Sequence, residues 1–227
     1  MASVNVDLVL DPVCPWCWLG HRYWRSAQAL VPHIAVETVL RPFQLDGSIP
    51  KAGLPYQAYM KARIGEDAQG RFKAMRAHLE AAGPEAGIVF NFDEITIRPN
   101  TMDAHRLIRW AGSPKSPPGA QDRMARRLFE LYFEEARDIG DRALLAEAAA
   151  DCGMDAALVT ALLASNADVD AVRGEIDTAA RMGVRGVPCF LIEGRYALVG
   201  AQEAETIADA LRQVAGAKAR GELDARD

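Results

Sequence analysis

The chain has 227 residues, of which 50% are hydrophobic and 25% charged, and its net charge is −5. The balance is ordinary for a globular protein with a proper core, and the length suits one core fold with an insertion better than two full domains. Lysines and arginines are scattered, which argues against nucleic acid as a partner. No apolar run approaches the roughly 20 residues that span a bilayer, so no membrane partner is expected.

The start of the chain enters strand-like alternation directly and lacks the basic region that opens a signal peptide. We therefore expect a cytoplasmic location. The four cysteines are too few for a disulfide-stapled scaffold. In a reducing compartment, a closely spaced cysteine pair is expected to be catalytic, redox-sensing or metal-binding.

A Cys-Pro-Trp-Cys motif, Cys14 to Cys17, stands between a predicted strand at 4–10 and a predicted amphipathic helix at 18–30. A second strand is predicted at 34–40, so the motif lies in a βαβ unit, the setting of thioredoxin-like redox centres. The start of the helix offers free backbone N–H groups and the positive end of the helix dipole, both of which favour a thiolate. We predict that Cys14 is the nucleophile and Cys17 the resolving thiol.

The centre of the chain is dominated by helical periodicity, and strands return only near the end. The predicted helices cover residues 55–64, 67–82, 101–110, 120–136, 142–152, 155–163, 169–182 and 203–215. The predicted extended segments are 88–92, 95–97, 189–192 and 196–199.

This order of elements predicts an α/β protein: a thioredoxin fold with a large all-helical insertion between its βαβ and ββα halves. The thioredoxin-like domain is predicted to comprise residues 1–45 and 183–217, and the insertion residues 46–182. We expect the insertion to form one wall of the substrate groove. Residues 218–227 are charged and are expected to be a flexible tail.

Several motifs together resemble one protein family. They are DPVCPWCWLG at 11–20, NT at 100–101 with AHRL at 104–107, LFELYF at 128–133 and GVPCF at 186–190. Over residues 4–215 the chain resembles the DsbA-family thioredoxin proteins of the FrnE-like branch. The same superfamily contains 2-hydroxychromene-2-carboxylate isomerase and the kappa-class glutathione transferases.

The resemblance implies a second half of the site far along the chain. The Val187–Pro188 bond would be cis and would lie against the two sulfurs, so that its backbone can pair with an extended substrate; the alternative is that Pro188 starts an edge strand. Pro15 and Trp16 lie between the cysteines, and Trp16 is expected to be a partly exposed apolar platform. Asn100 is carried over as a binding residue, although a helix cap would explain it equally well.

The function implied is that of a cytoplasmic thiol-disulfide oxidoreductase with no bound cofactor, because the electrons reside in the cysteine pair. Glutathione is a possible co-substrate, and the partner would be a disulfide- or dithiol-containing protein or a small-molecule thiol; a homodimer is possible. The isomerase and kappa-transferase branch typically has serine where Cys14 stands, so keeping both thiols favours dithiol chemistry.

Two other functions stay open. The chain could be a glutathione-dependent transferase or isomerase that acts on a small electrophile through Cys14. It could instead be a partner-binding or redox-sensing module. A metal site is not predicted, because a single CxxC pair lacks the second close pair of a zinc ribbon.

The remaining cysteines and the polar residues near the motif are interpreted individually. Cys189 follows Pro188 and could be a third thiol near Cys14, but a buried strand residue is favoured. Cys152 is expected to be core packing. His21 is expected at the surface and His105 as a structural histidine. Asp11 either relays the proton of Cys17 or only forms the turn before the motif.

Overall fold

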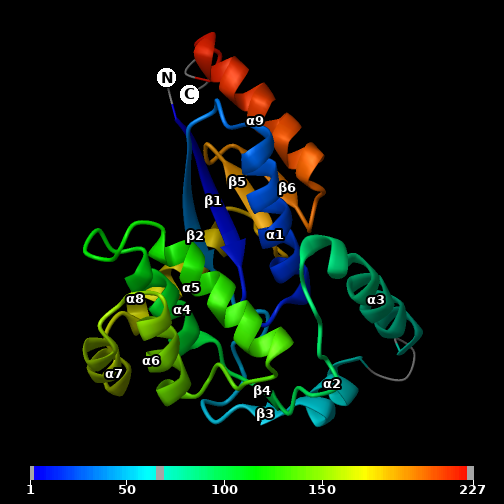
Figure 1. Ribbon diagram of the computed structural model, residues 1–227, viewed down its shortest axis with the longest axis vertical. Coiled ribbons are helices and arrows are strands. Elements are labelled where there is room, and N and C mark those ends of the chain that lie inside the picture. The colour runs from blue at the N-terminus through cyan, green and yellow to red at the C-terminus, as the bar shows by residue number, and fades with distance from the viewer. Residues whose placement is uncertain (1–2, 65–68, 224–227) are drawn as a thin grey trace.

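The computed structural model describes residues 3–64 and 69–223. A four-stranded sheet with the order β2-β1-β5-β6 forms its centre (Figure 1). β1 (Val4–Leu10) and β2 (Val36–Pro42) are parallel and are joined by α1 (Pro15–Leu30). β5 (Cys189–Ile192) pairs antiparallel with β1, and β6 (Tyr196–Val199) with β5. The predicted thioredoxin fold is confirmed.

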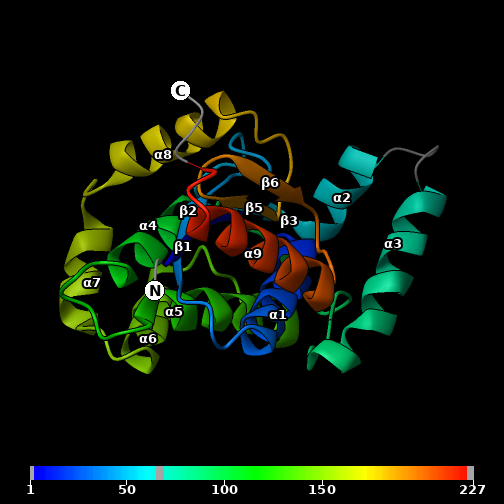
Figure 2. The same cartoon turned by 90° about the horizontal axis from the view of Figure 1, so that it is seen from above.

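Helices cover both faces of the sheet. α1 packs with α9 (Ala204–Ala219) on one face, and α8 (Val169–Arg181) lies against β2 on the other (Figure 2). The alternation of side chains along each strand explains these layers. In β5, Phe190 belongs to the core shared with α1, whereas Cys189 and Leu191 join a smaller core cluster with Ala179 of α8.

The segment between β2 and β5, predicted to be all-helical, is mostly helical but not entirely so. Its helices are α2 (Tyr56–Ile64), α3 (Gln69–Ala82), α4 (Met102–Ala111), α5 (Ala120–Phe129), α6 (Arg142–Asp151), α7 (Ala156–Ala164) and α8. It also contains one short antiparallel pair, β3 (Leu54–Pro55) with β4 (Ile97–Arg98). Hydrophobic residues of this segment share one core cluster with β1 and α1, so the division into two domains stays a prediction.

Two predicted elements of the insertion differ in the structure. The helix predicted at 120–136 changes to a π-helical turn, Glu130–Glu134, after α5 ends at Phe129. Segment 88–92 joins no strand; its aromatic rings pack instead, with Phe90 and Phe92 stacked at a centroid distance of 5.0 Å. Aromatic packing and isolated hydrogen bonds, such as that from Asn91 N to Phe133 O, hold this segment in place of a strand ladder.

The last helix is longer than the periodicity predicted. α9 continues to Ala219, where Lys218 Nζ donates to Ser3 O at 2.7 Å and pairs with Glu193 at 2.8 Å. Leu223 is buried. Lys218 and Leu223 of the predicted tail thus contact the rest of the fold, residues 219–222 are exposed, and the flexibility of the tail stays a prediction. Residues 224–227, like residues 67–68 of a predicted helix, lie outside the described part of the chain. None of the described helices combines the length and the hydrophobicity needed to cross a membrane.

Candidate active site

Cys14 stands at the point where the chain enters α1. Its backbone is still extended, with φ −96° and ψ 112°, and Pro15 occupies the first turn of the helix, where a missing N–H has no consequence. The N–H groups of Cys17 and Trp18 donate to Cys14 O at 2.9 and 3.2 Å. The thiol of Cys14 itself points across to Val187, with Sγ 3.6 Å from Val187 O.

Cys17 lies behind Cys14 and is fully buried. Burial raises the pKa of the Cys17 thiol well above its ordinary value, and the neighbouring Cys14 raises it further. All four cysteines are free thiols, so the structure represents the dithiol form. Cys17 is therefore a protonated thiol that needs a proton acceptor before it can attack a sulfur.

The loop before β5 closes the site from the other side. The Val187–Pro188 peptide bond is cis. Pro188 O accepts a hydrogen bond from Gly200 N at 2.8 Å, and the Pro188 ring packs against Gly20 of α1. A Cβ carbon at Gly20 would lie 2.7 Å from Pro188 Cγ, so only glycine leaves room for this contact.

An apolar pocket of about 360 Å³ opens at Cys14. Its walls come from the CxxC turn, the Gly186–Val187 loop, α2 and α3, so the predicted insertion supplies part of the lining. The lining residues are Val13, Cys14, Pro15, Trp16, Leu45, Tyr56, Tyr59, Met60, Arg63, Ile64, Phe72, Met75, Phe92, Arg98, Tyr132, Phe133, Gly186 and Val187. Trp16 is partly exposed, as predicted, and its ring lies 5.4 Å from that of His78.

A buried polar cluster lies beneath the two cysteines. Asp11 is 1% exposed; its Oδ2 accepts from Leu45 N at 2.8 Å, while its Oδ1 has no hydrogen-bond partner. His105 Nε2 donates to Phe43 O at 2.9 Å and lies 3.6 Å from Asp11 Oδ1. Besides burial and Cys14, a backbone hydrogen bond with Asp11 lowers the pKa of Cys17, and the charge of the Asp11 carboxylate raises it.

Arg98 adds a positive charge to this region. The residue is 6% exposed and lines the apolar pocket, and its Nη1 donates to Val13 O at 3.1 Å. Burial lowers the pKa of Arg98, but the carboxylate of Asp11 and the phenol groups of Tyr132 and Tyr59 outweigh that effect and raise it, so the guanidinium stays charged. Burial also raises the pKa of Tyr132, which keeps its phenol neutral.

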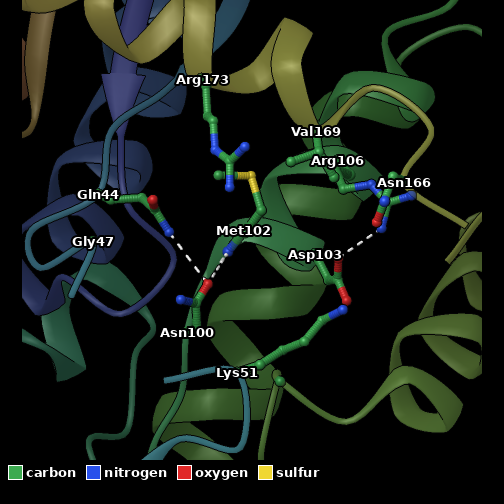
Figure 3. A pocket seen from close by; sticks show the side chains of 11 residues that line it. Gln44, Gly47, Lys51, Asn100, Met102, Asp103, Arg106, Asn166, Val169 and Arg173 are labelled. Carbon is green, nitrogen blue, oxygen red and sulfur yellow. Dashed lines mark hydrogen bonds and ion pairs between the residues drawn. The ribbon is translucent and has the colours of Figure 1, made fainter. Parts of the chain in front are cut away.

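Asn100 lies in a different pocket. It borders a polar hollow of about 300 Å³ between the loop after β2 and the starts of α4 and α8 (Figure 3). Its Oδ1 accepts from Met102 N at 2.9 Å, and its Nδ2 donates to Ile49 O at 2.6 Å. The N-cap residue of α4 is Thr101, so Asn100 stands one residue before it; its Oδ1 satisfies the first N–H of the helix, while its Nδ2 ties the start of α4 to the loop at Ile49. Of the predicted site residues, Cys14, Pro15, Trp16 and Val187 thus line one pocket, Cys17 and Pro188 pack directly behind it, and Asn100 does not line it.

The individual histidine and cysteine predictions have mixed outcomes. Cys189 faces α8 on the far side of the sheet, as a buried strand residue, and Cys152 is core packing. His105 is a structural histidine, as predicted. The surface position expected for His21 is wrong: it is 1% exposed, with Nε2 2.9 Å from Asp122 of α5.

The sequence-based interpretation missed Arg98 and the aromatic and methionine lining from α2 and α3. A signal for Arg98 was present, because a charged residue directly follows the alternating apolar residues Ile95 and Ile97. Among the described residues, no group of three or more His, Cys, Asp or Glu side chains is arranged to hold a metal ion.

The family description "DSBA-like thioredoxin domain" matches residues 5–212 of the chain. The chain belongs to this family. The DsbA-like resemblance predicted from its motifs is thereby confirmed. A solved structure, that of a probable DsbA oxidoreductase from Streptomyces coelicolor, is similar with a TM-score of 0.84 and 31% sequence identity, covering 94% of this chain and 90% of that one.

Two more distant structures share the fold. 2-Hydroxychromene-2-carboxylate isomerase has a TM-score of 0.67 at 17% identity, covering 98% of this DsbA-like chain and 100% of its own. The cytosolic disulfide reductase DsbM from Pseudomonas aeruginosa, solved with glutathione, has a TM-score of 0.62 at 17% identity, covering 95% and 99%. At such identities these two likenesses concern the fold alone.

Proposed function

We propose that this DsbA-like protein is a thiol-disulfide oxidoreductase in which Cys14 is the nucleophile and Cys17 the resolving thiol. The observation that carries the proposal is the position of Cys14, at the start of α1 and in the lining of a pocket, whereas Cys17 is fully buried and does not line it. Only Cys14 of the pair lines the space that a substrate can enter.

The chemistry follows from this arrangement. Cys14 Sγ attacks a substrate disulfide, the substrate S–S bond breaks, and one substrate thiolate leaves. Cys17 then loses its proton and attacks Cys14 Sγ, which releases the second substrate thiolate and leaves a Cys14–Cys17 disulfide. The substrate gains two electrons and the protein loses two. The reverse sequence oxidises a dithiol.

Asp11 is proposed as the proton acceptor for Cys17. Its Oδ1 has no hydrogen-bond partner, and its charge acts on the buried thiol. The Asp11 carboxylate can accept the proton of Cys17 when this thiol attacks the mixed disulfide.

The location, cofactor and partners belong to the same proposal. The protein acts in the cytoplasm, without a bound cofactor, on a disulfide- or dithiol-bearing partner, and glutathione is a possible co-substrate. The cytosolic reductase DsbM, whose structure contains glutathione, supports this choice by analogy of fold. A homodimer stays a prediction.

A second function is favoured by the apolar pocket at Cys14, which is large enough for a small molecule. It is a glutathione-dependent transferase or isomerase that uses Cys14 alone on a small electrophile. The fold of 2-hydroxychromene-2-carboxylate isomerase is similar.

The Cys17→Ser variant separates the two functions. A dithiol mechanism predicts that this variant stops at a mixed disulfide on Cys14, observed as an intact mass increased by one substrate thiol. Conjugation or isomerisation through one thiol predicts activity close to that of the wild type. Turnover of disulfides by Cys17→Ser at the wild-type rate would overturn the proposal.

A further inference from the structure

The apolar pocket at Cys14 contains a buried cation whose hydrogen bonds are incomplete. Arg98 lines the pocket, and its Nη1 donates to Val13 O. Its Nε is buried and has no hydrogen-bond partner among the described residues. An unsatisfied donor on a charged group at this depth is unfavourable by several kcal/mol unless something pairs with it.

The protein supplies only part of that pairing. Asp11 raises the pKa of Arg98 through its charge, and a side-chain hydrogen bond with the neutral phenol of Tyr132 raises it as well. Asp11 itself is engaged elsewhere, because its Oδ2 accepts from Leu45 N and its Oδ1 lies beside His105. No described carboxylate forms an ion pair with Arg98, although most other arginines of the chain have one. The ring of Tyr59 lies 5.4 Å from its guanidinium carbon.

The other lining residues of the pocket limit the class of ligand that it can bind. The walls are aromatic and aliphatic, with Tyr56, Phe72, Phe92 and two methionines, and they contain no described acidic side chain. Such a pocket suits a ligand that is mostly apolar or aromatic and carries a negative charge. The described lining has no carboxylate to form an ion pair with an ammonium group, which disfavours amino-acid disulfides such as cystine.

We propose that the pocket binds an aromatic or similarly apolar small molecule that carries a carboxylate, with its reactive sulfur at Cys14 and its carboxylate on Arg98. This inference rests on the proposed thiol-disulfide function and names its substrate class. The guanidinium forms charge-assisted hydrogen bonds with the carboxylate, and the volume of about 360 Å³ holds one ring system at a time. Arg63 lines the same pocket and is 57% exposed, so it adds only a screened attraction.

With such an aryl disulfide, the reaction follows the same two steps of thiol-disulfide exchange as proposed above. One aryl sulfur bonds to Cys14 while its partner leaves as an aryl thiolate, and Cys17 then closes the protein disulfide and releases the second aryl thiolate. Two electrons pass from the dithiol to the substrate. A single turnover by fully reduced protein therefore needs no other reductant.

The test compares two disulfides that differ only in charge. They are dithiobis(nitrobenzoic acid), which carries a carboxylate on each ring, and its uncharged diamide. Single-turnover rate constants of the reduced wild-type protein are measured from the released aryl thiolate and divided by the rates of the same disulfides with free glutathione. We expect the carboxylate to be favoured at least about tenfold, as for one hydrogen bond to a charged group.

Variants assign the preference to Arg98. Arg98→Met is expected to lose the preference, and Arg98→Lys to keep part of it, because a single ammonium cannot form the paired bonds of a guanidinium. Arg173→Met, which removes a 64% exposed arginine elsewhere, is the control and should retain it. Equal normalised rates for the two disulfides in the wild-type protein would overturn the inference, whatever the folding of the variants.

A binding measurement distinguishes failure of this inference from failure of the proposed function. Methylthio-nitrobenzoate and its amide, which cannot undergo exchange, are titrated by calorimetry into protein with both Cys14→Ser and Cys17→Ser. Tighter binding of the carboxylate by at least about tenfold supports the Arg98 subsite even if no disulfide is ever reduced. Equal binding of both compounds, or binding of neither, contradicts it.

Discussion

Gly20 of α1 packs directly against Pro188, so closely that a Cβ carbon at Gly20 would lie 2.7 Å from Pro188 Cγ. The two residues come from the two separate halves of the thioredoxin fold, and their contact sets how near the cis-proline loop approaches Cys14. Val187, the residue before Pro188, accepts the hydrogen bond of the Cys14 thiol. The approach of the Pro188 loop to Cys14 thus depends on the lack of a Cβ methyl group at Gly20.

Gly20→Ala is expected to displace the Pro188 loop. The neighbour is a proline ring, which cannot swing aside as a flexible side chain would, so overpacking of about 1–3 kcal/mol outweighs the roughly 0.5–1 kcal/mol that alanine gains in a helix. We predict a lower free energy of unfolding and a disulfide-exchange rate reduced by about tenfold or more. Urea unfolding and stopped-flow exchange measure the two effects.

Gly174→Ala is the matched control, because nothing lies within 4 Å of a Cβ carbon at that helical position. It should be neutral or slightly stabilising, with unchanged exchange. Equal behaviour of the two variants would show that the Gly20–Pro188 contact is not tight.

Asp11→Asn is expected to slow the second step of the reaction and leave the first unchanged. The amide cannot accept the Cys17 proton, so the mixed disulfide on Cys14 should persist about a hundredfold longer. Quenched-flow mass spectrometry follows its lifetime, with Asp209→Asn, 63% exposed, as the control. An unchanged lifetime in Asp11→Asn would exclude Asp11 as the proton acceptor.

The dithiol form is expected to lose stability at alkaline pH. Burial raises the pKa of Cys17 in the folded state, so above about pH 8.5 the unfolded chain releases its proton while the folded chain keeps it. The folded state then binds more protons, and stability falls with rising pH by up to about 1.4 kcal/mol per pH unit for this group.

Cys17→Ala tests the alkaline effect. Between about pH 8.5 and 10, below the ordinary pKa of tyrosine, its free energy of unfolding should fall less steeply than that of the wild type in the presence of reductant. Cys152 and Cys189, whose pKa values burial also raises, supply the remaining slope. Parallel curves for variant and wild type would contradict the burial of Cys17 as a neutral thiol.

Arg106→Met is expected to be the more destabilising of two substitutions around Asp103. Arg106 is fully buried and donates to Ala167 O and Leu162 O at 2.7 Å each, besides its ion pair with Asp103. Removing it leaves several buried acceptors unpaired, at about 3–5 kcal/mol. Arg142→Met, which removes a 37% exposed partner of the same Asp103, should cost about 1 kcal/mol or less. Thermal and urea unfolding compare them; similar losses would contradict the account.

The order of elements and the cysteine pair could be predicted from the sequence, because period-two alternation and the CxxC spacing are local signals. The same signals failed for His21. Helical periodicity identifies one buried face of α1, whereas this helix packs against α9, α3 and α5, so a second face is buried as well. The position of Cys189 also needed the structure, since only the pairing of β5 with β1 decides which face of the sheet it joins.

The pocket was the least predictable part of the site. Its lining comes from α2, α3, β4 and the Val187 loop, and no short-range pattern connects them. Arg98 in particular marked the end of a predicted extended segment, and only the folded arrangement places its charge beside Cys14.

The central claim is tested most directly by equilibrating the protein with glutathione redox buffers and measuring which cysteines are oxidised. Intact mass and differential alkylation after denaturation should show one reversible two-electron transition that pairs Cys14 with Cys17 and leaves Cys152 and Cys189 as free thiols. Absence of any reversible transition, or a disulfide that includes Cys189, would contradict the account.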